Sequence, residues 1–250
     1  MHNKTIMIAL GGNSLSPKGS AGSVTEQFSL ARKTMNNLSE FIDLNYNICI
    51  THGNGPQVGD ELLRMDLTSE TVPPLPLGIC VANTQGQIGY MVQQTLQNEL
   101  REKSVDREVV TLVTQVIVDK NDQSINNPTK FIGPRYTKSE IEKFATKLGW
   151  SIKEQEPGSW RRVVPSPMPE FIMHGKSIKA LVDRGTIVIA FGGGGIPVFN
   201  NKDNKIEGLD AVIDKDFSAA KMGRIIRAQE LWIISDIDYL YRNFGEEDAS

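Results

Sequence analysis

A lysine flanked by two aspartates is the feature of the sequence that most directly suggests chemistry. Asp214, Lys215 and Asp216 stand immediately ahead of a stretch of helical periodicity at residues 217–227. Phosphoryl transfer requires positive charge on the migrating group and carboxylates that hold a lysine or a magnesium ion. The same triplet suits the solvated start of a helix, because acidic side chains favour the N-terminal end of the helix dipole. On its own, the triplet allows both interpretations.

Three glycine-rich loops point to the same chemistry, because each follows a predicted strand. They are Gly11-Gly12-Asn13-Ser14, His52-Gly53-Asn54-Gly55-Pro56 and the four glycines 192–195. In open α/β sheets, ligands bind at the carboxyl ends of the strands, where glycine lets backbone N–H groups converge on an anion. Helix N-termini after the first two loops would add dipole ends that favour phosphate. A tight turn explains any one loop, but three together favour an anion site.

Several common catalytic signatures are missing from the chain. There is no Gly-x-x-x-x-Gly-Lys-Ser/Thr pattern, and residues 53–58 fail the last position of Gly-x-Gly-x-x-Gly. There is also no Gly-x-Ser-x-Gly elbow, and the three histidines lack metal-ligand spacing. These absences disfavour P-loop NTPases, Rossmann dehydrogenases, serine hydrolases and zinc enzymes.

The elements that must position these loops alternate along the chain. Apolar runs predict strands at residues 5–10, 46–51, 109–118, 186–191 and 231–235, and helical periodicity predicts helices at residues 24–44, 57–69 and 83–103. Parallel neighbouring strands need crossover connections, which such helices supply. We therefore expect an α/β fold, a three-layer α/β/α sandwich with a mainly parallel central sheet.

One segment breaks this alternation. Residues 119–169 are rich in Asn, Pro, Lys and Arg, with one helical stretch near residues 137–148. About fifty residues are too many for a plain loop in a compact sheet, so the segment predicts a small lobe or lid. Lys130 could swing from it over an anionic ligand, although a surface lysine is the simpler interpretation. For Trp160-Arg161-Arg162 we expect an exposed basic patch at the lobe junction.

Composition narrows the partners and the compartment. The 250 residues are 39% hydrophobic and 23% charged, with a formal net charge of −3. No polycationic surface is expected, so nucleic acid and anionic membranes are not predicted partners. The two cysteines form no Cys-x-x-Cys site, and no apolar run approaches a signal peptide or a membrane span. A soluble, cytoplasmic protein is the expectation.

At this point the sequence resembles the carbamate kinases of the amino-acid kinase family, over nearly its whole length. The matching segments are Ala9-Leu10-Gly11-Gly12-Asn13, residues 51–59 with Gly-Asn-Gly-Pro-Gln-Val-Gly, residues 85–91, Asn127-Pro128-Thr129-Lys130, Val163-Val164-Pro165-Ser166-Pro167, residues 192–197 and residues 211–216. The resemblance implies a homodimer of amino-acid kinase domains (residues 1–250) with a protruding subdomain at 119–167. It implies reversible phosphoryl transfer between ATP and carbamate, giving ADP and carbamoyl phosphate, with ATP formed during arginine catabolism by the arginine deiminase pathway.

The resemblance also implies roles for individual residues. Lys215 would face the transferring phosphoryl group, Asp216 would organise the catalytic lysines, and Lys130 would reach from the lobe to the substrate phosphate. The phosphate-binding loops would contribute Gly11, Gly12, Asn13, Gly53, Asn54, Gly55, Gly193 and Gly194. Nucleotide contacts would come from Lys215, Ser235 and Asp236. No protein metal site is expected, because Mg²⁺ would arrive with ATP or ADP.

Two departures from the family pattern leave an alternative open. Pro157-Gly158-Ser159-Trp160-Arg161 stands where the family tends to have Gly-Arg-Gly-Trp-Arg. Family members also continue past Asp238 to a Gly-Ser-Met-x-Pro-Lys motif whose lysine assists transfer. We therefore expect weak nucleotide binding and slow turnover from these 250 residues, and the alternative is a catalytically impaired binding protein of the same fold. A kinase acting on glutamate or aspartate fits less well, because the lobe resembles that of carbamate kinases.

Overall fold

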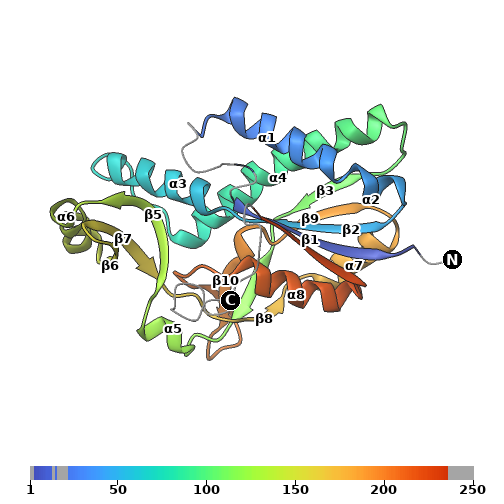
Figure 1. Ribbon diagram of the computed structural model, residues 1–250. Coiled ribbons are helices and arrows are strands. Elements are labelled where there is room, and N and C mark those ends of the chain that lie inside the picture. The colour runs from blue at the N-terminus through green and yellow to red at the C-terminus, as the bar shows by residue number, and fades with distance from the viewer. Residues whose placement is uncertain (1–2, 13–14, 16–21, 236–250) are drawn as a thin grey trace, which may run out of the picture.

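A parallel sheet forms the centre of the molecule (Figure 1). The computed structural model describes residues 3–12, 15 and 22–235. Five strands lie in the order β12-β1-β2-β9-β3, and every neighbouring pair is parallel. Their bounds are Thr5–Leu10 (β1), Asn47–His52 (β2), Val109–Leu112 (β3), Ile187–Ala190 (β9) and Glu230–Ile234 (β12). Four of the predicted strands are thereby confirmed within a few residues.

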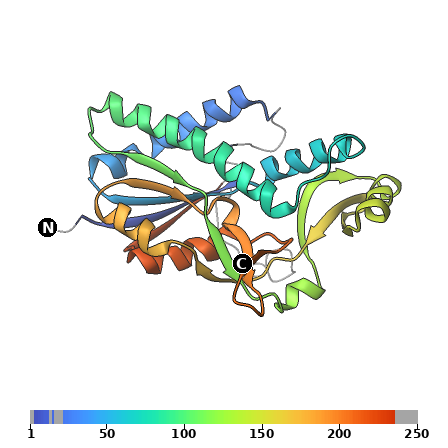
Figure 2. The same cartoon turned by 180° about the vertical axis from the view of Figure 1, so that it is seen from behind.

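Helices cover both faces of this sheet, as the alternation along β1 requires. Ile6, Ile8 and Leu10 belong to one buried cluster, with side chains of α1 (Val24–Asn37) and α4 (Leu77–Glu102). Met7 and Ala9 belong to a second cluster, with α7 (Gly175–Asp183) and α8 (Lys215–Ile226). Figures 1 and 2 show α1 and α4 above the sheet and α7 and α8 below it. The three-layer α/β/α sandwich is confirmed.

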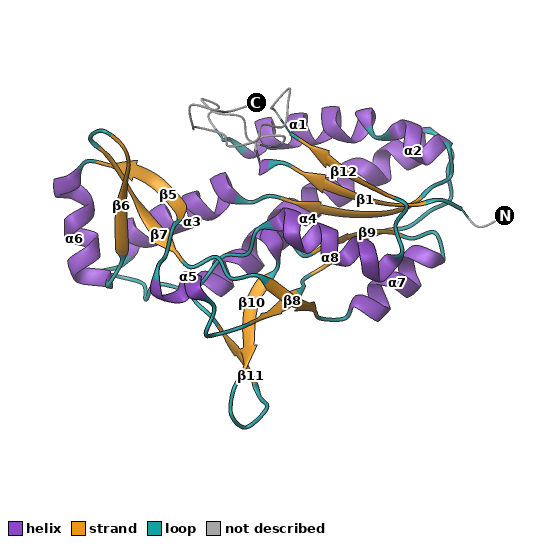
Figure 3. Cartoon of the chain, turned by 60° about the horizontal axis from the view of Figure 1, so that its bottom comes forward, coloured by secondary structure: helices purple, strands orange, loops and turns teal. Residues whose placement is uncertain are grey.

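The single strand predicted at residues 109–118 is wrong, because the chain changes sheets within it. β3 pairs with β9 as far as Leu112, whereas β4 (Gln115–Val118) pairs with β10 (Ile196–Asn200). At the break, Gln85 of α4 accepts a hydrogen bond from the Thr114 N–H and donates one to the Thr114 carbonyl. β4 continues a second sheet with β8 (Pro169–Ile172) and β11 (Ile206–Gly208), in the order β11-β10-β4-β8 (Figure 3).

Two helix boundaries also differ from the prediction. The helix expected at residues 24–44 ends at Asn37, and a short α2 (Ser39–Asp43) follows. The helix expected from residue 83 begins at Leu77, whose N–H donates to the Asp210 carboxylate. α3 (Gly55–Thr68) agrees with its prediction. Among the described residues, no helix has both the length and the apolar character needed to span a membrane.

Residues 130–164, which we call the lobe, stand apart from the sandwich beside α3 (Figures 1 and 3). The lobe contains α6 (Lys138–Leu148) and an antiparallel sheet of β5 (Lys130–Tyr136), β7 (Ser159–Val164) and β6 (Ser151–Glu156). The short α5 (Gln123–Asn126) precedes it. Only α6 was expected from the sequence, and a capping box of Thr137 and Glu140 fixes its start. The three-stranded sheet was not predicted.

Candidate active site

The first two glycine loops meet through their backbones at the carboxyl edge of the central sheet. β1 and β2 are neighbours, and the Gly53 N–H donates to the Leu10 carbonyl at 2.8 Å. A Cβ added to Gly53 would lie 2.7 Å from the Gly12 nitrogen, closer than real Cβ contacts occur. Only glycine permits this approach, which brings Gly11 and Gly12 beside Gly53, Asn54 and Gly55. Asn13 lies outside the described residues.

The third loop fits between the second loop and the segment that carries Lys215. Phe191, Gly193 and Gly194 all have positive φ, at 44°, 66° and 89°. A Cβ on Gly193 would lie 2.3 Å from the Asn54 amide nitrogen, and one on Gly194 would lie 2.3 Å from the Ile213 carbonyl oxygen. The chain therefore turns back tightly here, and Gly193 and Gly194 lie against the other two parts of the candidate site.

The Asp-Lys-Asp triplet lies at the N-terminus of α8. Asp214 is the N-cap, and its side chain accepts a hydrogen bond from the Asp216 N–H at 2.9 Å. Lys215 Nζ donates to Asp216 Oδ1 at 2.6 Å, and Lys130 Nζ reaches from the lobe to Asp214 Oδ2 at 3.1 Å. Each lysine thus has its own carboxylate. Asp216 holds Lys215, whereas Lys130 is held by Asp214, which the sequence analysis named within the triplet without assigning it a role.

Two electrostatic consequences follow from this packing. Burial would raise the pKa of Asp214, but the Asp216 N–H and the charges of Lys130 and Lys215 outweigh it, so this pKa lies below its usual range. His52, at the end of β2, is fully buried, and burial lowers its pKa to about 4. Its Nδ1 lies 3.0 Å from the Gly53 carbonyl oxygen, so the neutral ring donates there. At neutral pH the positive charge of the site therefore comes from lysines.

Helix α4 supports two of the loops with polar side chains that the sequence analysis did not single out. Asn54 Nδ2 donates to the Thr84 hydroxyl at 2.9 Å. Buried Gln85 donates to the Gly192 carbonyl at 3.0 Å, in addition to its two hydrogen bonds with Thr114. A buried amide costs free energy unless its hydrogen bonds are made. Polar residues on the otherwise apolar face of this helix were therefore the sequence signal from which these supporting side chains could have been predicted.

Of the nucleotide positions named above, Ser235 directly follows β12, the neighbour of β1. It is exposed at the same carboxyl edge as the first loop. Asp236 lies outside the described residues. Within residues 3–12, 15 and 22–235, no group of three His, Cys, Asp or Glu side chains is placed to hold a metal ion.

Comparison with known proteins identifies the family to which this arrangement belongs. Residues 4–250 match the model of the amino acid kinase family. The chain belongs to the amino acid kinase family. Among curated members, it is 46% identical to the carbamate kinase of Pyrococcus furiosus, over 98% of this chain and 78% of that protein. It is also 46% identical to carbamate kinase 2 of Staphylococcus epidermidis, over 97% of this chain and 77% of that protein.

Solved structures agree with the fold of this amino acid kinase. The carbamate kinase from Giardia lamblia bound to AMP-PNP superposes with a TM-score of 0.88 at 34% identity, covering 99% of this chain and 78% of that one. The same enzyme bound to citric acid gives a TM-score of 0.87 at 36% identity, covering 94% and 76% of the two chains. Both similarities extend over the central sandwich and the lobe.

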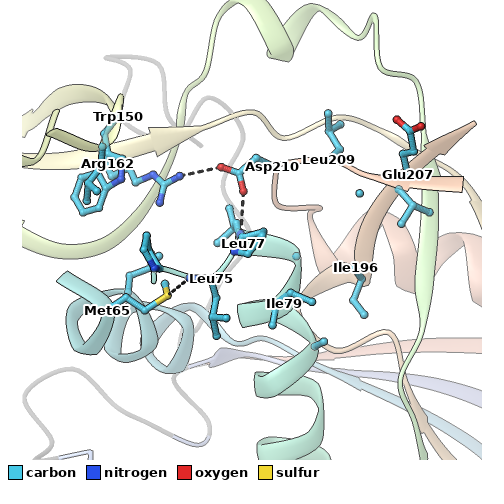
Figure 4. A pocket seen from close by; sticks show the side chains of 18 of the residues that line it. Met65, Leu75, Leu77, Ile79, Trp150, Arg162, Ile196, Glu207, Leu209 and Asp210 are labelled. Carbon is cyan, nitrogen blue, oxygen red and sulfur yellow. Dashed lines mark hydrogen bonds and ion pairs between the residues drawn. The ribbon is translucent and has the colours of Figure 1, made fainter. Parts of the chain in front are cut away.

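The junction between lobe and sandwich in this amino acid kinase is not the exposed basic patch expected from the sequence. Arg161 Nε donates to the Gly133 carbonyl within the lobe. The Arg162 side chain is only 13% exposed, lies over the Trp150 ring at 5.0 Å and pairs with Asp210 at 3.1 Å (Figure 4). The acidic partner comes from a distant part of the chain, so the expectation of solvent exposure was wrong. An apolar cavity of about 780 Å³ adjoins this pair, away from the glycine loops.

Proposed function

We propose that the chain is a carbamate kinase, which transfers a phosphoryl group reversibly between ATP and carbamate and forms ADP and carbamoyl phosphate. The observation that carries this proposal is the convergence of two lysines from separate parts of the chain, Lys130 and Lys215, on the carboxylates beside the glycine loops. The two curated relatives named above are carbamate kinases, which supports the same substrate. They give no support to the alternative of a non-catalytic binding protein.

In this proposal the backbone of the glycine loops shapes the substrate site, and the lysines stabilise the negative charge of the phosphoryl group. The loops of Gly11 and Gly12, of Gly53 to Gly55, and of Gly193 and Gly194 line the site for the phosphoryl group and the carbamate, while the N–H groups of Gly11, Gly53 and Gly194 hold the loops in place by donating to backbone carbonyls. Lys215 neutralises the charge that spreads over the migrating group in the transition state, and Asp216 keeps its ammonium oriented. Lys130 binds the substrate phosphate, leaving Asp214 when the substrate arrives. Ser235 and Asp236 contact the nucleotide.

Magnesium would enter with the nucleotide rather than occupy a protein site. Mg²⁺ commonly binds one or two carboxylates and takes its other ligands from water and phosphate. Asp214 and Asp216 provide two such carboxylates at the start of α8, so the residues present fit this mode. When bound, the ion would offset the negative charge of the phosphates, while the chain supplies the orientation.

We further propose that residues 119–167 work as a lid. The lobe contacts the sandwich through Lys130, through the Arg162–Asp210 pair and through an apolar cluster that joins Ile132 and Val164 to Leu62, Leu77 and Val212. Closure would bring Lys130 onto the substrate and exclude water from the transferring group.

A homodimer is also part of the proposal, and α4 supplies the supporting surface. Its first 22 residues, 77–98, contain no charged side chain. One face is nevertheless exposed, at Ile79, Asn83, Gly86, Tyr90 and Gln94, with Ile79 at 47% and Tyr90 at 59%. A Cβ on Gly86 would meet nothing within 4 Å, which leaves room for a close helix crossing. A Gly86→Glu variant should therefore sediment as a monomer if this face joins two copies.

The test of the proposed function is ATP formation from ADP and carbamoyl phosphate, coupled to hexokinase and glucose 6-phosphate dehydrogenase. ATP should appear only when Mg²⁺ and both substrates are present. Acetyl phosphate in place of carbamoyl phosphate controls for a nonspecific phosphotransferase. Calorimetry that shows ADP binding, together with an assay that shows no ATP, would contradict the proposal. We propose that the physiological direction is ATP formation during arginine catabolism. The assay does not test this direction, which requires an experiment in cells.

A further inference from the structure

The segment of residues 209–216 connects the lobe to the candidate catalytic lysine in a regular way. Three alternate residues face the lobe: Asp210 pairs with Arg162 at 3.1 Å, Val212 packs in the cluster that contains Ile132 and Val164, and Asp214 pairs with Lys130 at 3.1 Å. The Val212 N–H also donates to the carbonyl of Pro165, at the end of the lobe. Val212 and Asp214 alternate with Ala211 and Ile213 as the two sides of a strand do, whereas Asp210 lies at a bend closed by the hydrogen bond from the Ala211 N–H to the Leu209 carbonyl.

The opposite side of the same segment faces the sandwich. Ala211 and Ile213 are 0% and 3% exposed, and the Ile213 carbonyl lies directly against Gly194. The segment then becomes the N-terminus of α8, where Lys215 lies. Packed atoms therefore connect the lobe both to the third glycine loop and to Lys215.

Asp210 also contacts helix α4, which adds a third element to this connection between the lobe and Lys215. Its Oδ2 accepts from Arg162, and its Oδ1 accepts from the Leu77 N–H at the start of α4 at 2.9 Å (Figure 4). Helix α4 in turn holds Asn54 through Thr84 and Gly192 through Gln85. One carboxylate thus joins the lobe, the segment before Lys215 and the helix that supports two loops.

We propose that Arg162 and Asp210 form a positioning pair that aligns segment 209–216, and with it Lys215, according to the position of the lobe. Arg162 is nearly buried, so its charge strongly favours keeping the Asp210 partner. A cavity of about 780 Å³ adjoins the pair, which is one of the polar contacts between the lobe and the rest of the chain on that side, together with Tyr136–Asp66. The proposal rests on the proposed function and adds residues that need not touch the substrate.

The experiment is a double-mutant cycle with Arg162→Met and Asp210→Asn. The Asn side chain keeps an oxygen for the Leu77 N–H and removes the charge that Arg162 requires, so α4 retains its N-terminal partner. Each single variant should lower kcat for ATP formation about tenfold, and the double variant should fall no further, because contacting residues couple strongly. The Kd for ADP should stay within twofold of wild type. Arg162→Lys should recover part of kcat.

Asp183→Asn is the matched control, since it breaks the exposed Lys179–Asp183 pair on α7 and should leave kcat unchanged. Additive losses in the cycle, or a loss of ADP affinity equal to the loss of kcat, would overturn the proposal.

Hydrogen–deuterium exchange tests the same coupling without depending on the ATP assay. Amides of residues 209–216 should exchange faster in Asp210→Asn and in Arg162→Met than in wild type, even if wild type forms no ATP. Unchanged exchange in both variants would reject the coupling, whereas absence of ATP in wild type alone would reject the proposed function.

Discussion

The glycine-loop edge and the lobe contribute to the candidate site in different ways, the edge through packed backbone and the lobe through side chains. The edge is made of backbone, in which Gly53, Gly193 and Gly194 lie so close to their neighbours that a methyl group would not fit. The lobe has exposed ion pairs, such as Arg135 with Glu156, and reaches the site by one long side chain, Lys130. Backbone packing fixes the shape of the edge, whereas the half-exposed Lys130–Asp214 pair can open at small cost. We therefore expect changes in the packing of the edge to appear in stability and changes in the lobe to appear in the use of substrates.

Lys215 should show the largest effect, because it belongs to the edge yet acts by charge. Lys215→Ala should lower kcat by about two powers of ten or more, the usual loss when a group that stabilises the transition state is removed. Its ion pair is with the half-exposed Asp216, and such pairs contribute little to stability, so the thermal midpoint should hardly move. The coupled assay and a circular dichroism melt measure both. Lys176→Ala, at an exposed lysine of α7, is the control, and an unchanged kcat in Lys215→Ala would refute the role.

His52 should make the edge sensitive to acid. Its pKa is about 4 when folded and 6.5 when unfolded, so between these values the unfolded chain binds more protons. The contribution of His52 to the free energy of unfolding should be fully present above pH 6.5. It should decrease as the pH falls, and about 3 kcal/mol should be lost by pH 4. Urea unfolding at pH 7 and pH 5 should show a smaller pH difference for His52→Gln than for wild type. His174→Asn, at an exposed histidine, should retain the wild-type difference, and equal slopes in all three proteins would contradict this assignment.

Gly53 and Gly55 give a matched pair within one loop. Gly53→Ala would force a methyl group toward the Gly12 nitrogen, and overpacking of this kind costs about 1–3 kcal/mol. Gly55→Ala meets nothing within 4 Å and occupies the first residue of α3, so its melting temperature should match wild type. Differential scanning calorimetry of both variants decides the matter. Equal melting temperatures would mean that the two loops can move apart without loss of stability, which would contradict the prediction.

Lys130 should show the smallest effect of the four and confine it to one substrate. Lys130→Ala should raise the KM for carbamoyl phosphate about tenfold, as expected when one charged hydrogen bond is lost, and leave the Kd for ADP unchanged. Lys143→Ala, at an exposed lysine of the same lobe, should behave as wild type. A fall in ADP affinity without any change in carbamoyl phosphate use would show that the lobe does not act as a lid.

The sequence predicted those parts of the molecule that depend on local pattern. Alternating apolar runs and helices determine a parallel sheet, and a parallel sheet places the ends of β1, β2 and β9 at one edge, so the meeting of the loops followed. The helix α6 was predictable because its capping box and the left-handed Gly149 lie within the helix itself or adjoin it.

Features that depend on distant partners were missed. The break at Thr114 requires Gln85, and the burial of Arg162 requires Asp210, and neither pair is adjacent in sequence. The lobe sheet was missed because β6, Ser151–Glu156, has no buried residue and therefore lacks a clear apolar alternation. Asp214 was overlooked as the partner of Lys130 because the triplet specifies a helix start but not which side chain faces the lobe.

The hydrogen bond from the Thr51 hydroxyl to the Phe191 carbonyl joins residues 140 positions apart. The second and third glycine loops therefore cannot meet until β9 has paired with β2, which requires much of the intervening chain to be in place. Contacts of such long sequence separation form late and slowly during folding. The phosphate-binding edge should thus be among the last parts of the molecule to assemble, so a nascent or partly folded chain would have its helices before it could hold a ligand.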